Sequence, residues 1–389
     1  MKRVFICGVG MTAFGKQPGR GLRSMALEAI DKTVTDSGLS QDRIERVYFG
    51  NAIAPTVLQQ DMIKGQVALR DHPLGHLPLA NVENACASGG TAFLMAVEAV
   101  GSGCADVVLA VGVEQMHHSD KSRAFNALRG STDVGEIGEY VPGESSANSL
   151  LMNFYAGVAR EYLANSDAKV EDFANVAVKN RAHAVHNPLA QMVTPQTVEE
   201  VLASRMIVPP LTLAMCSPMT DGAAAALVCS ERVAKELSRT RIAVEACQMA
   251  SGAGGQPVAA AATKAYEYAS LGPEDFDLLE LHDAAAPAEL LQYHEIGLCP
   301  PDEGFRLLRD GVTSLGGRLP VNCSGGLLSR GHALGATGLA QLHELVWQLR
   351  GQAGRRQAEG ARRAMAINGG GWLDGAYALA IATVLQRHD

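Results

Sequence analysis

The sequence has few charged and few aromatic residues, and this excludes several classes of protein. Charged residues make up 19% and aromatic residues 5% of the 389 residues, whereas hydrophobic residues make up 47%. A chain of this composition can bury a large core, so we exclude a disordered protein. The formal net charge of −8 and the lack of a Lys or Arg block exclude a general nucleic-acid binder, because neutralising phosphates requires a basic surface.

Long apolar runs and paired cysteines are also missing. No uninterrupted apolar stretch approaches the roughly 18 residues of a membrane span, and the apolar run near Met1 is too short for a secretory signal. The 8 cysteines contain no Cys-x-x-Cys pair and lie in apolar segments. We therefore expect reduced, buried thiols, no disulfide framework, no metal site and a cytoplasmic location.

Glycine and alanine are abundant, with 41 glycines and alanine-rich runs such as residues 221–227. Small residues let helices pack closely on a sheet, which favours a layered α/β fold. The apolar and β-branched patterns predict strands at 3–7, 107–111, 224–229, 242–247, 278–282 and 364–367, and helices at 22–36 and 92–101. Because strands and helices alternate, we expect a mainly parallel sheet.

Distant parts of the chain repeat the same order of motifs, which indicates an internal duplication. The matching pairs are 42–51 with 275–283, 84–90 with 322–326, and 107–112 with 364–371. We predict one half formed by residues 1–118 and 205–238 and a second half formed by residues 239–389. The alternative is that a Gly/Ala-rich chain repeats these motifs by chance.

Residues 119–204 interrupt the first half and are more polar and irregular than the rest. They include the stretches 130–133 and 136–144 and a predicted helix at 170–186. We predict an inserted loop domain here. His183 and His186 share one face of that helix, but Lys179 and Arg181 lie beside them, which favours a solvated helix face over a metal site.

Two nucleotide-binding motifs near the N-terminus are incomplete. Gly8-Val-Gly10 follows a predicted strand, but Ala13 stands where a dinucleotide motif has its third glycine. Residues 10–16 resemble a phosphate loop until Gln17, where a Ser or Thr hydroxyl would hold magnesium. Neither motif supports nucleotide binding.

Cys86 is the candidate nucleophile. It lies in a turn of small residues, 82–91, just before a predicted apolar helix. Backbone N–H groups and the helix dipole at such an N-terminus favour a thiolate, so we expect the pKa of the Cys86 thiol to be lowered. The alternative, a buried structural thiol, applies to most of the other cysteines.

His332 is the candidate base, and His282 provides a second imidazole. His332 lies in the glycine-rich loop 322–338, which also precedes a long apolar helix. If the duplication holds, this loop meets the Cys86 turn and forms a Cys–His pair, in which the imidazole takes the thiol proton. His282, at the tip of the strand 278–282, points from the sheet edge where such folds place their sites.

These motifs resemble those of the thiolase superfamily over nearly the whole chain, especially sterol-carrier-protein-type thiolases and acetyl-CoA acetyltransferases. Asn84-Ala-Cys86-Ala-Ser-Gly89 resembles the nucleophile motif. Gly331-His332-Ala-Leu-Gly-Ala-Thr-Gly338 resembles Gly-His-Pro-x-Gly-Ala-Thr-Gly with alanine in place of proline, and His282-Asp283 resembles His-Asp-Cys-Phe. The resemblance implies a five-layered α-β-α-β-α fold made of two duplicated halves and an inserted loop domain.

The resemblance also implies roles for individual residues. Cys86 would be acylated by an acyl-CoA, His332 would activate it, and His282 would position the thioester oxygen. Coenzyme A would be a substrate, and no bound cofactor or metal is expected. Further contacts are implied by the same motifs: the Cys86 N–H with a glycine of 369–371, such as Gly369 or Gly370, in an oxyanion hole, and Ser217 and Met116 on coenzyme A.

One family feature is missing. Thiolases have a second cysteine that moves the α-proton, but the two positions where it is expected hold Ala284 and Asn368, or Ile367 in a shifted register. Cys323 is a possible auxiliary thiol, although its apolar setting favours a packing role. Another acid or base is therefore needed, such as His282, a substrate carboxylate or a residue of the inserted loop.

Three functions are consistent with these residues. The first is a thiolase-type acyltransferase that cleaves a 3-oxoacyl-CoA with free CoA through a Cys86 acyl-enzyme. The second is a thiolase-like C–C lyase or C-acyltransferase subunit working with a small zinc-ribbon and OB-fold protein, which the missing cysteine favours. The third is a non-catalytic scaffold subunit, which Cys86 and His332 disfavour. The resemblance also implies a homodimer.

Overall fold

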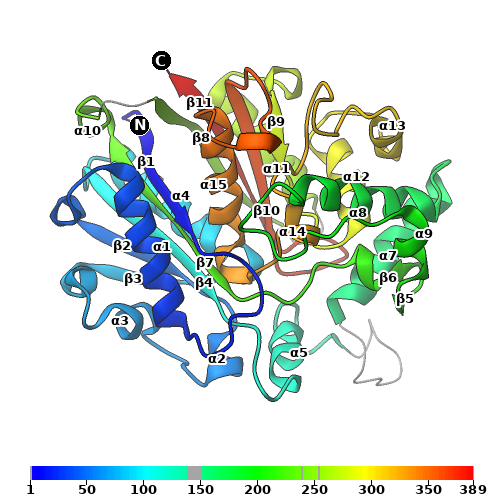
Figure 1. The fold of residues 1–389 in the computed structure, drawn as a ribbon, viewed down its shortest axis with the longest axis horizontal. Coiled ribbons are helices and arrows are strands. Elements are labelled where there is room, and N and C mark those ends of the chain that lie inside the picture. The colour runs from blue at the N-terminus through cyan, green and yellow to red at the C-terminus, as the bar shows by residue number, and fades with distance from the viewer. Residues whose placement is uncertain (1, 138–149, 238–239, 253–254, 389) are drawn as a thin grey trace.

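The computed structural model describes residues 2–137, 150–237, 240–252 and 255–388 (Figure 1). The strands are β1 (Val4–Met11), β2 (Arg46–Gly50), β3 (Leu79–Val82), β4 (Val107–Glu114), β5 (Met206–Val208), β6 (Leu211–Thr212), β7 (Gly222–Ser230), β8 (Arg241–Ser251), β9 (Leu278–Glu280), β10 (Arg363–Gly370) and β11 (Leu379–His388). Every strand that the sequence predicts is present, with its ends shifted by a few residues.

The longer helices are α1 (Leu22–Ser37), α4 (Ser88–Gly101), α5 (Ser122–Arg129), α7 (Leu150–Asn165), α8 (Val170–Ala184), α11 (Pro257–Ala269), α12 (Ala286–Glu295) and α15 (Thr337–Leu349). Shorter ones are α2 (Ala54–Leu58), α3 (Lys64–Leu69), α9 (Val198–Ala203), α10 (Glu231–Ala234), α13 (Gly304–Arg309) and α14 (Gly326–Ser329). None of the helices in the described part of the chain has the length and apolarity needed to cross a bilayer.

Nine strands form one sheet in the order β3-β2-β4-β7-β1-β8-β11-β10-β9. From the centre of the sheet outward, β8-β11-β10-β9 of the second half repeats β1-β7-β4-β2 of the first half, as the duplicated motifs predict, and β3 has no counterpart among the strands of the described residues. The sheet is mixed, so the expectation of a mainly parallel sheet was wrong: β2 is parallel to β3 and β4, and β9 to β10, but β7 and β11 are antiparallel to their neighbours. A turn joins β10 directly to β11, and such a connection makes an antiparallel pair.

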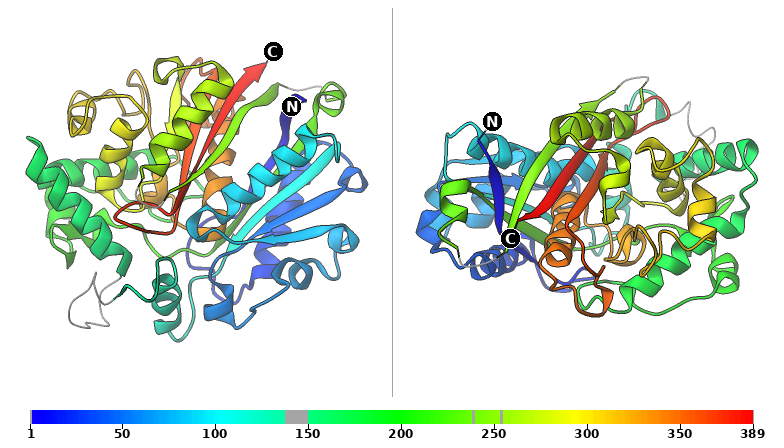
Figure 2. Two further views of the ribbon diagram at one scale, coloured as in Figure 1. Left: turned by 180° about the vertical axis from the view of Figure 1, so that it is seen from behind. Right: turned by 90° about the horizontal axis from the view of Figure 1, so that it is seen from above.

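The helices α4 and α15 lie between the two halves of the sheet, each packed against strands of both halves (Figures 1 and 2). On the outer faces, α1 packs against β1 and β7, and α11 packs against β8 and β11. Helix, sheet, helix pair, sheet and helix therefore make five layers. The central core is apolar and includes Val97, Leu342 and Val346.

The glycines of the first strand serve close packing. A Cβ on Gly8 would lie 2.4 Å from the carbonyl oxygen of Thr33, and a Cβ on Gly10 would lie 2.6 Å from the Thr33 nitrogen, both in α1. These contacts explain the Gly-x-Gly pattern without a nucleotide, because any side chain would push the helix from the sheet.

The predicted insert is helical over most of its described part, and α7 and α8 pack against α12 of the second half. Most of the predicted stretch 136–144 lies outside the described residues. The prediction of a solvated face on α8 was wrong: His183 is buried and its Nδ1 bonds to the Asn322 carbonyl oxygen, and buried Lys179 pairs with Glu289 at 3.1 Å. The polar residues of α8 face the second half because they find partners there. The predicted domain boundaries remain predictions.

Candidate active site

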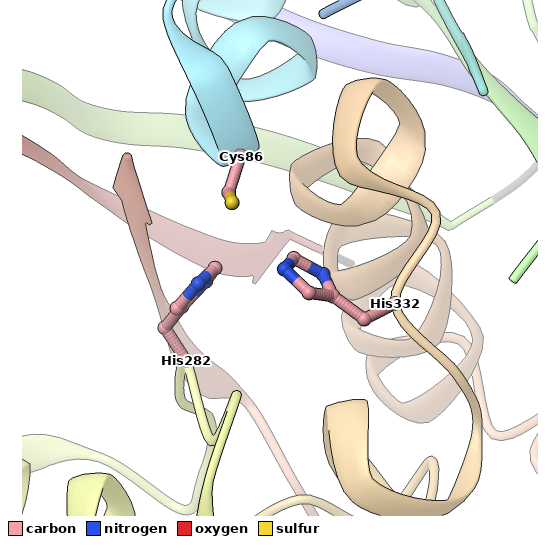
Figure 3. Close-up of side chains that lie close together, drawn as sticks. All are labelled: Cys86, His282 and His332. Atoms are coloured by element: carbon pink, nitrogen blue, oxygen red, sulfur yellow. The ribbon is translucent and has the colours of Figure 1, made fainter. Parts of the chain in front are cut away.

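Three predicted site residues lie together where the two halves meet. Cys86 lies in the turn η3 (Ala85–Ala87) before α4, His282 follows β9, and His332 lies in the loop between α14 and η6 (Leu334–Ala336). The Cys86 Sγ and one ring nitrogen from each histidine are all within 4.8 Å of one another. Figure 3 shows the three side chains pointing toward a common centre.

Glycines allow the two turns to approach so closely. A Cβ on Gly89 would lie 2.5 Å from the carbonyl oxygen of Gly335, and a Cβ on Gly112 would lie 2.1 Å from the same oxygen. Real side chains do not tolerate such distances, so the packing of η6 against the start of α4 and the end of β4 requires these glycines. The small-residue motifs of the sequence therefore bring the thiol and the imidazole together.

The hydrogen bonds of His332 define its tautomer. Its Nδ1 lies 2.7 Å from the Thr337 hydroxyl, and that hydroxyl donates its proton to the Ala333 carbonyl oxygen at 3.0 Å. The hydroxyl must therefore accept from the His332 Nδ1–H, which leaves Nε2 with a free lone pair. The backbone N–H of His332 donates to the Thr220 hydroxyl at 2.9 Å and holds the loop in place.

His282 has the opposite tautomer because of Asn368. The Asn368 amide nitrogen donates to His282 Nδ1 at 3.3 Å and to the Cys86 carbonyl oxygen at 3.2 Å. An amide NH₂ only donates, so the proton of neutral His282 lies on Nε2. The cluster thus combines a thiol, a base and an imidazole donor. The same bond disfavours a metal ion, which would need the Nε2 lone pair of His282.

Both the thiol and the imidazoles are neutral in the resting site. Burial, followed by the charge of Glu114, raises the pKa of the Cys86 thiol to about 12. Burial lowers the pKa of His282 to about 3 and the pKa of His332 well below its ordinary value. The expected lowering of the Cys86 pKa was wrong, because loss of solvation outweighs the backbone N–H groups near the sulfur.

The backbone donors near the sulfur come from Cys86 itself and Gly371, and both favour the thiolate. The resemblance placed this donor on one of the glycines 369–371, and the N–H near the sulfur is that of Gly371. Gly371 has a φ of 63°, which turns the chain after β10. Gly369 and Gly370 allow close packing: a Cβ on Gly369 would lie 2.8 Å from the Tyr377 ring, and one on Gly370 would lie 2.4 Å from the Asn84 carbonyl oxygen.

Cys86 and His332 line a pocket of about 440 Å³, and His282 is buried next to them outside its wall. Its lining residues are Cys86, Met116, His117, Phe125, Leu128, Leu151, Met152, Tyr155, Gln191, Arg205, Ile207, Leu213, Cys216, Ser217, Pro218, Met219, Ala284 and His332. The predicted contacts Ser217 and Met116 are both in this wall. Cys323 is fully buried and is absent from the wall, and its pKa is raised by burial and by Glu280.

Comparison with known families agrees with this geometry. Residues 4–207 match the model of the thiolase N-terminal domain, and residues 242–383 match that of the thiolase C-terminal domain-like family. The chain belongs to the thiolase family. The family and its curated relatives identify it as an enzyme of the acyltransferase type.

Among the relatives of this thiolase is an acetyl-CoA acetyltransferase of Methanothermobacter thermautotrophicus, 38% identical, covering 95% of this chain and 97% of the relative. Benzoylsuccinyl-CoA thiolase subunit BbsB of Thauera aromatica is 37% identical, and 95% of each chain is covered. Sterol carrier protein 2 of Rattus norvegicus is 36% identical, covering 95% of this chain and 70% of that protein.

Two solved structures have the same fold as this thiolase. One is the Ltp2-ChsH2(DUF35) aldolase, with a TM-score of 0.79 and 26% identity, covering 98% of this chain and 97% of that chain. The other is human mitochondrial 3-ketoacyl-CoA thiolase, with a TM-score of 0.73 and 18% identity, covering 100% and 99%. The second likeness supports the five-layered fold that the sequence predicts.

Sequence reasoning did not identify Tyr155, Tyr377 or Glu114. Tyr155 lines the pocket from α7, and its hydroxyl donates to that of Tyr377 at 3.2 Å. Glu114 is buried at the end of β4, and its pKa is raised to about 7, mainly by burial. No motif spacing indicated these residues. Tyr155 lies on α7, within the predicted insert, and its place over the pocket follows only from tertiary packing.

Proposed function

We propose that this thiolase cleaves a 3-oxoacyl-CoA with free CoA through an acyl-enzyme on Cys86. The observation that carries this proposal is the convergence of the Cys86 thiol with His282 and His332, within 4.8 Å, at a pocket of about 440 Å³. A neutral thiol beside the free lone pair of an imidazole can lose its proton as it attacks a carbonyl carbon.

Each group has a distinct task in this reaction. His332 Nε2 takes the Cys86 proton as the sulfur attacks C3 of the substrate. The backbone N–H groups of Cys86 and Gly371 stabilise the oxyanion that forms on the C3 carbonyl oxygen. Each donor lowers the activation free energy by about 3 kcal/mol. The Nε2–H of His282 donates to the thioester oxygen, on which negative charge develops when the C2–C3 bond breaks. CoA then attacks the acyl-enzyme, and its proton passes through His332 to the leaving sulfur.

Product analysis with a series of 3-oxoacyl-CoA substrates tests this proposal. Wild-type enzyme should convert each turned-over substrate and one CoA into two acyl-CoA products, and Cys86→Ala should abolish turnover. Cys323→Ala is the matched control, because that thiol is buried and does not line the pocket. Cleavage by Cys86→Ala at the wild-type rate would refute the assignment of the nucleophile.

A second candidate reaction is C–C lyase or C-acyltransferase chemistry with a small zinc-ribbon and OB-fold partner. It is favoured by Asn368 and Ala284, which stand where a second cysteine is expected, and by the likeness to the Ltp2-ChsH2(DUF35) aldolase. A lyase would release a free carbonyl product without consuming CoA. Measuring CoA consumption against product formation separates the two reactions, with co-purification testing the partner.

We also propose that the enzyme is a homodimer, as the resemblance to thiolases implied, and the cytoplasmic location stays a prediction from the sequence. The short strand β3 lies at one edge of the sheet, and an edge strand can pair with another copy. Light scattering during gel filtration should give twice the monomer mass, 40.9 kDa. A scaffold subunit without activity would form no acyl-enzyme with any acyl-CoA.

A further inference from the structure

Cleavage of a 3-oxoacyl-CoA requires an acid that can protonate C2. When the C2–C3 bond breaks, the electron pair stays on C2, which must receive a proton. Ala284 and Asn368 cannot provide it, because a methyl group and an amide do not exchange protons in this way. The assignment of this acid rests on the Cys86 acyl-enzyme proposed above.

Among the described residues, the buried part of the pocket lining offers two candidate side chains for this acid. Beyond Cys86 and His332, the buried lining residues that carry an exchangeable side-chain proton are Tyr155 and Cys216. The Cys216 thiol donates to the Thr212 carbonyl oxygen at 3.4 Å, and burial alone raises the pKa of Cys216 to about 12. Cys216 therefore points toward its own segment, away from the charges of the cluster.

Tyr155, in contrast, is linked to the cluster by hydrogen bonds. Its hydroxyl donates to Tyr377 at 3.2 Å, and the Tyr377 hydroxyl donates to the carbonyl oxygen of His282 at 3.3 Å. The Tyr377 ring also packs edge-on against the His282 ring, with 5.5 Å between centroids. Burial raises the pKa of the Tyr155 phenol, the hydrogen bond to Tyr377 opposes this effect, and ionisation of Cys86 would raise the pKa further.

Aromatic contacts fix the Tyr155 ring while the hydroxyl proton stays free to rotate. Trp372 packs edge-on against Tyr155 at 5.4 Å and stacks on Phe154 at 5.3 Å. Trp372 and Tyr377 belong to the turn that follows Gly371, so the same turn provides an oxyanion donor and the support for the phenol. Rotation about the C–O bond can direct the Tyr155 proton either to Tyr377 or into the pocket.

We propose that Tyr155, supported by Tyr377, is the catalytic acid that protonates C2 of the departing acyl-CoA. The Sγ–C3 bond forms as Cys86 gives its proton to His332. The C2–C3 bond then breaks, and the Tyr155 hydroxyl proton moves to C2. The phenolate takes up the proton held by His332, which leaves a neutral acyl-enzyme and a neutral phenol. No oxidant or other co-reactant is needed.

Burial raises the pKa of both phenols above the ordinary value, so both are protonated at neutral pH. A protonated phenol suits an acid for C2, because a thioester enolate is a much stronger base than a phenolate. In the reverse direction, transfer of the phenol proton to His332 would create the base that removes an α-proton. Tyr155 should therefore also catalyse exchange of α-hydrogens with solvent.

The test measures acylation and α-hydrogen exchange in the same variants. Purified enzyme is incubated with acetyl-CoA in D₂O; the acetyl adduct is measured by intact mass and deuterium in acetyl-CoA by mass spectrometry. Tyr155→Phe should keep the acetyl adduct and lose exchange by at least about 100-fold, the usual effect of a general acid or base. Tyr377→Phe should lose less, because the Tyr155 hydroxyl remains.

The control is Tyr162→Phe, which removes another buried phenol from α7 outside the pocket and should leave exchange unchanged. Exchange in Tyr155→Phe within threefold of wild type, roughly the scatter of such rates, would overturn the proposal. If Cys216→Ala loses α-hydrogen exchange while Tyr155→Phe keeps it, the acid would be Cys216 instead. Wild-type enzyme that is acylated but exchanges no α-hydrogen would also overturn it. Failure of wild-type acylation would instead refute the Cys86 acyl-enzyme.

Discussion

Glu280 and Arg330 form a fully buried ion pair, with 3.1 Å between Oε2 and Nη1. Glu280 precedes His282 by two residues, and Arg330 precedes His332 by two residues. The pair therefore joins the strand end and the loop that carry the two histidines, whose ring centroids are 5.2 Å apart. The Ser324 hydroxyl donates to Glu280 and accepts from Arg330, which strengthens the link.

Breaking this pair should destabilise the fold and slow catalysis. Arg330→Met leaves the Glu280 carboxylate buried without its cation, which costs about 3–5 kcal/mol. The double variant Arg330→Met, Glu280→Gln should recover part of that loss, because no unpaired charge remains. Urea unfolding measures the free energies, and Arg232→Met, which breaks an exposed pair with Asp106, should cost under about 1 kcal/mol. Equal losses in the two arginine variants would contradict this account.

Asn368 depends on a glycine beside it. A Cβ on Gly90 would lie 2.6 Å from the Asn368 Oδ1, so Gly90→Ala should displace the amide that orients His282. We expect kcat to fall with a modest loss of stability, about 1–3 kcal/mol, as in other overpacked sites. Gly255→Ala is a surface control, since a Cβ there meets no atom within 4 Å. An unchanged kcat in Gly90→Ala would show that the Asn368 contact is dispensable.

The reactivity of Cys86 should depend on pH as expected for a thiol with a high pKa. With a pKa of about 12, the thiolate fraction rises about tenfold for each pH unit between 7 and 10, and alkylation by iodoacetamide should rise with it. Glu114→Gln removes a nearby negative charge, lowers the Cys86 pKa and should speed alkylation at pH 8. A rate that is already constant from pH 6 upward would instead indicate a thiolate–imidazolium pair.

His183 should make the fold sensitive to acid. Burial lowers its pKa to about 3 in the folded state, against an ordinary value of 6.5. Between these values the unfolded chain binds a proton that the folded chain does not, so this stability is lost as the pH falls from 6.5 toward 3. When the pH is lowered from 7 to 4.5, the free energy of unfolding of the wild type should fall by about 2–3 kcal/mol more than that of His183→Gln. Urea unfolding measures these free energies, and an equal fall in wild type and His183→Gln would refute the role of His183.

Much of the site could be predicted from the sequence because it depends on local motifs. Cys86 and His332 lie in small-residue turns before apolar helices, and the duplication indicated that these turns meet. The resemblance limited the second oxyanion donor to the glycines 369–371 but did not single out Gly371, since the pleat and the turn after β10 decide which N–H faces the sulfur.

Electrostatics and long-range packing could not be predicted in the same way. The N-terminus of α4 indicated a lowered pKa for Cys86, but the pKa depends on how much solvent the second half removes. The position of Tyr155 likewise depends on how α7 packs over the second half, and its contacts with Trp372 and Tyr377 join residues more than 200 positions apart. Such contacts have no local pattern.

The most direct test of the whole account is rapid quenching of the enzyme with a 3-oxoacyl-CoA in the absence of free CoA, followed by peptide mass mapping. The account predicts an acyl group shortened by two carbons on the peptide that contains Cys86, and its release as acyl-CoA when CoA is added. An acyl group on any other residue, or cleaved product without an acyl-enzyme, would contradict it.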